Sequence, residues 1–216
     1  MLNIFALDVR EYAAALGVLG LCALGAAAAV KTPESVIDRW PGRPRSEARV
    51  LIAKYGEPAN FDDDSLIWYK NGPWQKTVVY RKAPQGLLGY HAKDILEQTI
   101  AYRVPDDKLA ELKRFDGRIR FDKANGQLSS VSESENLNYL ALNLVDEIVT
   151  DKRNADEARD FYRKTLKLTE SGKTSAYLDG FLFPLPPDSL TNPASEPIPP
   201  VPLEEPYRSG IPRPRP

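Results

Sequence analysis

The 216-residue sequence predicts an α+β fold: a small antiparallel sheet with a C-terminal helical hairpin, preceded by one N-terminal apolar helix that is a transmembrane or signal segment. Three observations lead to this prediction. Two pairs of short β-prone segments flank Asn-Gly dipeptides, which are typical of hairpin turns. Two amphipathic segments of helical period follow them and are separated by a short polar break. A long uncharged run lies near the N-terminus.

The uncharged run covers residues 12–30 and reads YAAALGVLGLCALGAAAAV. About 20 apolar residues span a bilayer, so the run indicates an uncleaved membrane anchor or a cleaved export signal. Ala27 and Ala29 suit a signal peptidase, whereas Asp8 and Glu11 make the preceding region unlike the positive start of a signal peptide. A helix buried in a soluble protein is the third interpretation. We expect residues 12–30 to contact a membrane.

The charges around the run conflict on orientation. Arg10 is the one basic residue before it, and the positive-inside rule would therefore place the downstream side in the cytoplasm. An apolar run followed by a whole domain more often directs export. We expect a bacterial inner-membrane location with a periplasmic domain, and the cytoplasmic face remains the alternative. The basic residues that follow the run are Lys31, Arg39, Arg43, Arg45 and Arg49.

Composition excludes several classes of function. The 29 basic and 30 acidic side chains give a net charge of -1, which provides no overall attraction to nucleic acid. Cys22 is the only cysteine and His91 the only histidine, so the sequence offers neither an intramolecular disulfide nor a His/Cys metal cluster. We expect no metal, no cofactor and no nucleic-acid partner.

The positions of proline and arginine residues suggest how the chain is divided into segments. Residues 1–31 form the anchor or signal segment, and residues 32–45 read as a linker. The α+β domain then covers residues 46–183, beginning with a helix at Ser46 that Gly56 and Pro58 end.

The first predicted hairpin joins Leu66–Tyr69 to Thr77–Arg81 through Asn71-Gly72-Pro73. Because proline cannot donate to a strand ladder, we expect a turn wider than two residues. Four aromatic residues gather here, and they form either a binding face or ordinary packing on one side of a small sheet. These candidate binding residues are Trp68, Tyr69, Trp74 and Tyr80.

The second hairpin is the clearest, with Arg118–Asp122 and Gln127–Val131 flanking Asn125-Gly126. Two helices follow it. Ser132 and Glu135 have the spacing of a capping box ahead of a wide apolar stripe. Asn154 caps the second helix, which runs to about Leu168 and places Ala158, Phe161, Tyr162, Thr165 and Leu168 on one side.

Residues 184–216 contain 12 of the 19 prolines and few apolar side chains. We expect this tail to be disordered, with polyproline II character. Its PxxP patterns suit a groove-binding ligand, and a spacer is the alternative.

The sequence gives little evidence for catalysis. It has no nucleophile elbow, no phosphate-binding glycine loop and no thiol in a polar setting. His91 with Asp94 three residues later forms an oriented base if that segment is helical, and a surface histidine is the alternative.

Three stretches, KYGEP…LIWYKNGPWQKTVVYR, HAKDILEQTIAYRVP and LNYLALNLVDEIVTDKRNADEARDFY, resemble a family of uncharacterised bacterial proteins over roughly residues 48–183. The segment from Tyr55-Gly56-Glu57-Pro58 to Trp68-Tyr69 is similar to the start of SmpA/OmlA-like outer-membrane assembly lipoproteins. In those proteins a YGxP element after a helix leads into a Trp/Tyr strand. This short resemblance implies an envelope location.

Together these observations predict a membrane-tethered bacterial envelope protein that acts as a binding or scaffolding component with a protein partner, including as an accessory subunit of a membrane complex. The alternative is an envelope hydrolase that uses carboxylates and His91.

Overall fold

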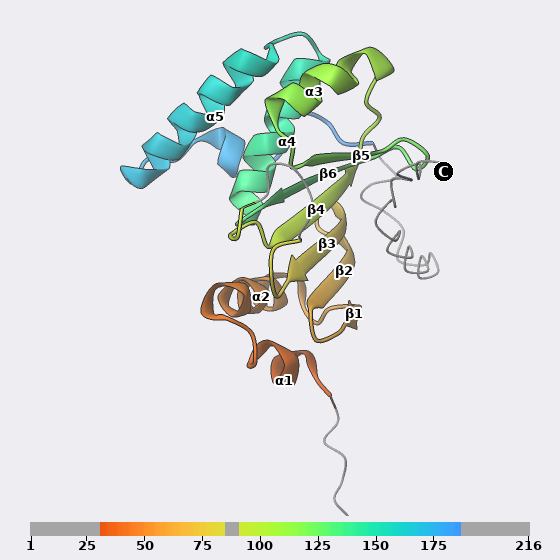
Figure 1. Ribbon diagram of the computed structural model, residues 1–216, viewed down its shortest axis with the longest axis vertical. Helices are drawn as coiled ribbons and strands as arrows, with labels where there is room; N and C mark the ends of the chain where they lie inside the picture. The colour runs from red at the N-terminus through yellow and green to blue at the C-terminus, as the bar shows by residue number, and fades with distance from the viewer. Residues whose placement is uncertain (1–30, 85–90, 187–216) are drawn as a thin grey trace, which may run out of the picture. The chain divides into compact units, whose positions relative to one another are not determined.

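One six-stranded antiparallel sheet organises the part of the chain that the structure, a computed structural model, describes: residues 31–84 and 91–186 (Figure 1). The strand order is β1-β2-β3-β4-β6-β5. The predicted α+β class with a small antiparallel sheet is therefore confirmed. The strands are β1 (Asn60–Phe61), β2 (Ser65–Asn71), β3 (Trp74–Tyr80), β4 (Leu96–Ala101), β5 (Ile119–Asp122) and β6 (Gln127–Ser132).

Strands β1 to β4 follow one another across the sheet, and the order then changes. A 3-10 turn, η1 (Asp106–Lys108), and helix α3 (Leu109–Phe115) take the chain to the far edge, where β5 begins. The β5–β6 hairpin returns the chain so that β6 pairs with β4. Asp122 pairs with Gln127, and Gly126 has a φ of +62°, so the predicted Asn125-Gly126 turn is confirmed.

The β2–β3 turn is tighter than the sequence predicts. Asn71 pairs with Trp74, which leaves only Gly72 and Pro73 in the loop. The prediction of a wider turn is wrong. Pro73 lies in the loop, where no hydrogen bond between the strands is required, so its missing N–H removes no strand-to-strand hydrogen bond. Gly72 accommodates the turn with a φ of +64°.

The predicted linker, residues 32–45, is folded. Thr32 caps helix α1 (Pro33–Ile37) with a reciprocal capping box, and helix α2 (Gly42–Tyr55) begins four residues before the expected Ser46. Pro44 does not prevent this start, since a first-turn proline lacks only an N–H that would have no helical partner. Three apolar side chains in this segment are buried, and they are Val36, Ile37 and Trp40.

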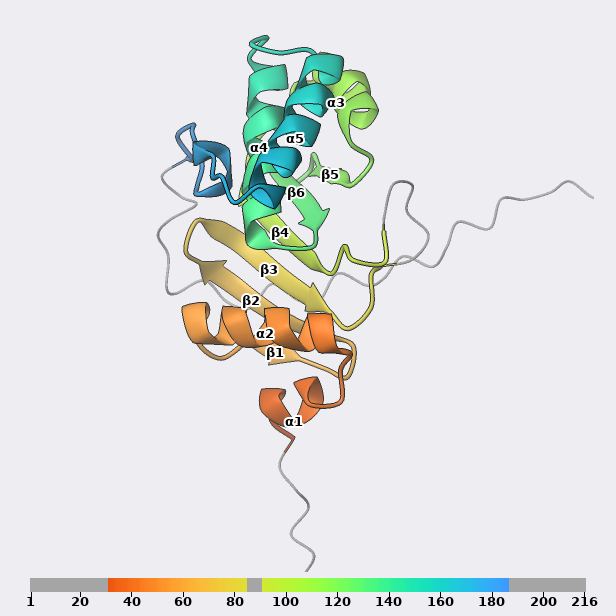
Figure 2. The same ribbon diagram turned by 90° about the vertical axis from the view of Figure 1, so that its left-hand side faces the viewer.

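Two hydrophobic clusters pack on one face of the sheet. The first joins α1 and α2 to Leu66, Trp68, Val79 and Leu96. The second joins α3, α4 (Glu135–Val149) and α5 (Ala155–Glu170) to β4, β5 and β6, with the short turn η2 (Ala176–Leu178) against α4. Figure 2 shows α2, α4 and α5 on the same side of the sheet.

Helix α5 starts at the predicted cap. The Asn154 side chain accepts hydrogen bonds from the backbone N–H groups of Asp156 and Glu157, each at 3.0 Å, and Glu157 accepts in return from the Asn154 N–H at 2.9 Å. Ala158 and Thr165 are buried as predicted. Leu168, predicted to lie on the same side of the helix as these residues, is 42% exposed, because it lies in the last turn, beyond the end of the packed face.

Within residues 31–84 and 91–186, no helix is both long enough and apolar enough to cross a bilayer. The apolar run 12–30 and residues 187–216 of the tail lie outside the described residues, so the predictions made for them stay predictions.

We expect Asn154→Ala to lower the free energy of unfolding by about 1 kcal/mol, because two N–H groups at the start of α5 lose their acceptor. Chemical denaturation of the full chain measures this change. Asn154→Asp keeps an acceptor at the cap and serves as the control. Equal losses in the two variants would show that the cap does not stabilise α5.

Candidate functional site

The carboxylate of Glu135 lies at the centre of the described polar groups. The sequence predicts it as the second half of a capping box with Ser132, and this prediction is wrong. Ser132 is the last residue of β6, and α4 begins after Ser134, which makes no side-chain cap. Glu135 is therefore the first residue of α4, and its side chain turns toward the sheet and α2.

Four donors from three other elements converge on this carboxylate. Its Oε1 accepts from the Tyr55 hydroxyl at 2.5 Å, from Trp74 Nε1 at 2.7 Å and from Gln98 Nε2 at 3.2 Å. Its Oε2 accepts from Lys54 Nζ in a salt bridge. The Glu135 side chain is only 11% exposed, whereas that of Lys54 is 48% exposed. One nearly buried anion thus connects α2, β3, β4 and α4.

This environment keeps Glu135 ionised. Burial raises the pKa of Glu135, but the hydrogen bonds from Lys54, Tyr55 and Trp74 outweigh burial and hold the pKa below its usual value. The same contact acts in reverse on Tyr55, whose pKa burial and the Glu135 carboxylate raise. Burial and the Glu135 charge also raise the pKa of Tyr139. A carboxylate with so many donors is a poor proton acceptor at neutral pH.

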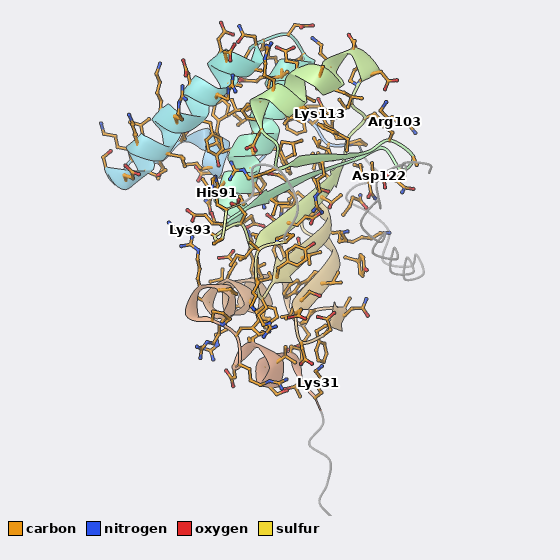
Figure 3. The ribbon with its side chains drawn as sticks, in the orientation of Figure 1. Lys31, His91, Lys93, Arg103, Lys113 and Asp122 are labelled. Carbon is orange, nitrogen blue, oxygen red and sulfur yellow. The ribbon has the colours of Figure 1, made fainter. Side chains whose placement is uncertain are left out.

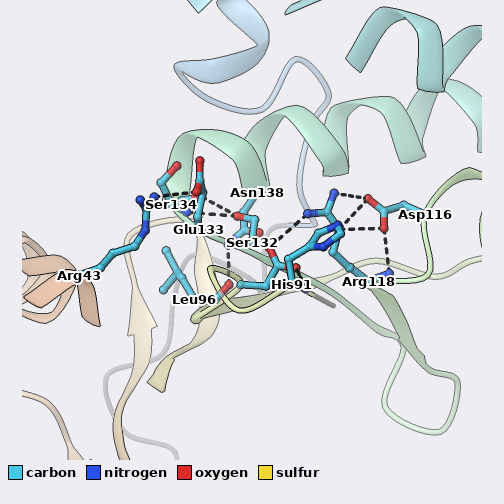
Figure 4. Close-up of polar contacts among 10 residues, drawn as sticks. Arg43, His91, Leu96, Asp116, Arg118, Ser132, Glu133, Ser134 and Asn138 are labelled. Carbon is cyan, nitrogen blue, oxygen red and sulfur yellow. Dashed lines mark hydrogen bonds and ion pairs between the residues drawn. The ribbon is translucent and has the colours of Figure 1, made fainter. Parts of the chain in front are cut away.

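A chain of amide and hydroxyl side chains continues from Glu135 under the helices. Gln98 Oε1 accepts from Asn138 Nδ2 at 3.0 Å. Asn138 also donates to the Leu96 carbonyl at 3.3 Å (Figure 4). Between β2 and β3, Asn71 Nδ2 donates to the Thr77 hydroxyl at 2.9 Å. All of these side chains are buried. The network separates the two hydrophobic clusters on this face of the sheet.

Two acceptors in the network have no hydrogen-bond donor in the described part of the chain: Asn71 Oδ1 and Asn138 Oδ1. A buried carbonyl oxygen without a donor costs roughly 1–3 kcal/mol. Asn71 lies at the end of β2, where the protein surface is hollowed.

That hollow is an open pocket of about 380 Å³ between the end of α2 and the end of β2. Lys54 and Tyr55 line it and also bind Glu135, so the pocket and the buried carboxylate share two side chains. Its lining combines cationic, aromatic and amide groups, and consists of Lys54, Tyr55, Glu57, Ala59, Trp68, Tyr69, Lys70, Asn71 and Gly72.

The pocket runs along an open sheet edge. β1 is two residues long and pairs with β2 only at Leu66 and Ile67. Trp68 and Tyr69 therefore have no strand partner on their outer side within residues 31–84 and 91–186. An unpaired edge is a template for an added strand.

The structure separates the four aromatic residues predicted to form a binding face. Trp68 and Trp74 are buried, and Trp68 Nε1 donates to the Gly56 carbonyl at 2.8 Å. Tyr69 lines the pocket. Tyr80 is half-buried and donates to Glu97 at 2.8 Å. They do not form one continuous face, because the packing against α2 and α4 takes up both tryptophans.

The sequence predicts His91 as a general base oriented by Asp94, but the two residues are not arranged as a catalytic dyad. Their hydrogen bond runs from the backbone N–H of His91 to Asp94 Oδ2 at 2.7 Å, and it does not involve the imidazole. The buried Asp94 carboxylate instead pairs with Arg118 at 3.2 Å, and Arg118 also pairs with Asp116 at 2.7 Å (Figure 4). The segment is a turn, not the helix that an i, i+3 contact requires.

Sequence reasoning missed Glu135, Lys54 and Tyr55 as members of one site. Their sequence separations of 80 and 81 residues leave no local signal. Among the described residues, no group of three or more His, Cys, Asp or Glu side chains is placed to hold a metal ion.

Comparison with known proteins gives no match: neither a protein-family model, nor a curated protein, nor a solved structure is similar to this chain at a significant level.

We expect Glu135→Ala to lower the free energy of unfolding by about 3 kcal/mol, because the buried donors of Trp74 and Gln98 lose their acceptor. Chemical denaturation of the full chain checks this. Glu135→Gln retains one acceptor oxygen and should lose less. The matched control is Glu133→Gln, which removes only a salt bridge to the half-exposed Arg43 and should change stability by less than about 1 kcal/mol. Similar losses at positions 133 and 135 would contradict the central role of Glu135.

The depressed pKa of Glu135 also predicts a pH dependence. A carboxylate with a folded-state pKa below its unfolded value of about 4.5 stabilises the fold above that value and loses this contribution as the pH falls through the folded pKa. The stability difference between the native chain and Glu135→Gln should therefore shrink on acidification from pH 7. Denaturation curves at several pH values measure it. A difference that grows toward acid would show that the folded-state pKa is raised.

Proposed function

We propose that this chain is a membrane-tethered bacterial envelope protein whose folded domain binds an extended segment of a partner protein along the outer edge of β2. The supporting observation is the pocket of about 380 Å³ that follows this edge beyond the last residue paired with β1. In such binding, main-chain hydrogen bonds provide affinity and the flanking side chains provide specificity.

The chemistry of the pocket supports one class of partner segment. Lys54 remains about half exposed although it pairs with Glu135, and Tyr55 and Tyr69 provide aromatic surface beside it. An extended peptide with an aliphatic residue next to an acidic one would complement this lining. The fixed ionisation of Glu135 favours binding over proton transfer, because its oxygens are already occupied by donors.

The tether and the envelope location rest on the sequence. The apolar run 12–30 supports membrane attachment. The envelope location is proposed from the resemblance of the segment from Tyr55-Gly56-Glu57-Pro58 to Trp68-Tyr69 to SmpA/OmlA-like lipoproteins. We also propose that α4 and α5 pack as an antiparallel hairpin that supports the sheet behind the pocket. As an accessory subunit, the chain would present this edge to a membrane complex.

Substitution in the pocket tests this function. We expect Tyr69→Asp to abolish recovery of the partner when the tagged full chain is purified natively from membranes and analysed by mass spectrometry, because an acid there repels an acidic segment. Val50→Asp is the matched control: it adds the same charge on α2, at a side chain that is 58% exposed and outside the pocket lining. Equal recovery with both variants would overturn binding at this edge. Release of the intact chain by carbonate extraction would separately overturn the tether.

A further inference from the structure

A second open pocket lies between the start of α4, the end of α5 and the turn η2, and the function proposed above does not use it. Its volume of about 450 Å³ falls within the range of roughly 300–1,000 Å³ that is typical of small-ligand sites. It shares no lining residue with the pocket beside β2. A ligand here would therefore bind at a site separate from the partner edge.

Hydrogen bonds hold two walls of this pocket in place. Helix α5 ends in a Schellman motif, in which Gly172 has a φ of +75° and the Lys173 N–H donates to the Leu168 carbonyl at 3.0 Å. On α4, Asn136 Nδ2 donates to the Leu178 carbonyl at 2.9 Å, which ties η2 to this helix. The pocket is thus formed by backbone whose position is fixed before any ligand arrives.

Three leucines give the pocket an apolar lining. Leu137 and Leu166 are half-buried, and Leu178 is 5% exposed. Leu166 belongs to neither of the two hydrophobic clusters, so the protein's own core does not cover its accessible surface. Burial of apolar surface contributes about 25 cal/mol per Å², and an aliphatic group placed against these leucines would therefore be stabilised.

Two charged side chains of the lining are available to a ligand. Glu133 is not one of them, because it pairs with Arg43 at 2.8 Å (Figure 4). Lys173 and Asp179 are exposed, and within residues 31–84 and 91–186 neither side chain makes a hydrogen bond or an ion pair, with the other or with a third residue. A cation and an anion beside one apolar surface complement a ligand that carries both charges next to an apolar group.

A free α-amino acid has this chemistry. Its ammonium and carboxylate groups are attached to the same carbon atom as the side chain, whereas a residue inside a peptide carries neither charge on its backbone. We propose that the pocket binds a free aliphatic amino acid such as leucine. Lys173 pairs with the carboxylate, Asp179 pairs with the ammonium, and Leu137, Leu166 and Leu178 contact the aliphatic side chain.

Titration of the full chain with defined probes tests the proposal. Leucine is added to isotope-labelled protein in an uncharged maltoside detergent, and the amide resonances of Gly172 and Lys173 are followed by NMR. We expect shifts that saturate with leucine concentration. Isocaproate lacks the ammonium, isoamylamine lacks the carboxylate, and glycine lacks the aliphatic side chain. Each should bind at least about fivefold more weakly than leucine, because each loses one of the three contacts.

Variants of the two charged residues assign each contact. Lys173→Gln should weaken leucine binding at least about fivefold and leave isoamylamine unaffected, because that amine has no carboxylate. Asp179→Asn should weaken leucine binding similarly and leave isocaproate unaffected. The matched control is Lys113→Gln, which removes an exposed lysine of α3 outside the pocket lining and should change no affinity (Figure 3).

Three results would overturn the proposal. The first is the absence of saturable shifts up to the solubility limit of leucine. The second is an equal affinity for leucine and for either probe that lacks one charge. The third is a Lys173→Gln variant that loses isoamylamine as well as leucine, which would show that the substitution disturbs the fold and does not remove a carboxylate contact. None of these results bears on the partner site, since the two pockets share no lining residue.

Discussion

The hydrogen bonds to Glu135 are the interaction on which the arrangement of the helices depends. The carboxylate is held by the end of α2, by the start of β3 and by the middle of β4, while its own backbone begins α4. Its charge also lies at the N-terminus of α4, where the helix dipole favours an anion. A single side chain thus links two helices on the same face of the sheet to each other and to strands β3 and β4 beneath them.

This position explains why one sheet supports two separate hydrophobic clusters. The cluster under α2 uses Leu66 and Val79, and the cluster under α4 uses Ile100 and Leu128. Thr77 and Gln98 lie between them and are buried but polar. Apolar contact across that line would not fix the position of α2, because hydrophobic packing is non-directional. Hydrogen bonds of defined length and direction provide the register that packing alone lacks.

The sequence predicts the features that depend on neighbouring residues. The Asn125-Gly126 turn and the Asn154 cap each need only a few adjacent side chains, and both are found. The role of Glu135 could not be predicted, since its partners lie 37 to 81 residues away and the local spacing to Ser132 points to a capping box. The prolines and arginines of segment 32–45 predict a linker. Its fold depends instead on burial of three apolar side chains in a core that only the tertiary structure provides.

The contrast between the closed network and the open edge determines what the site can do. A buried carboxylate with a lowered pKa and several donors has little capacity to move protons, so its effect is to hold Lys54 and Tyr55 in place. Those two side chains form one wall of the pocket beside Trp68 and Tyr69. A rigid wall reduces the entropy cost of ordering a bound segment. The lysine beside the edge also discourages pairing with an arbitrary strand, which protects the sheet from aggregation. Selectivity for a segment with an acidic residue then follows from the same charge.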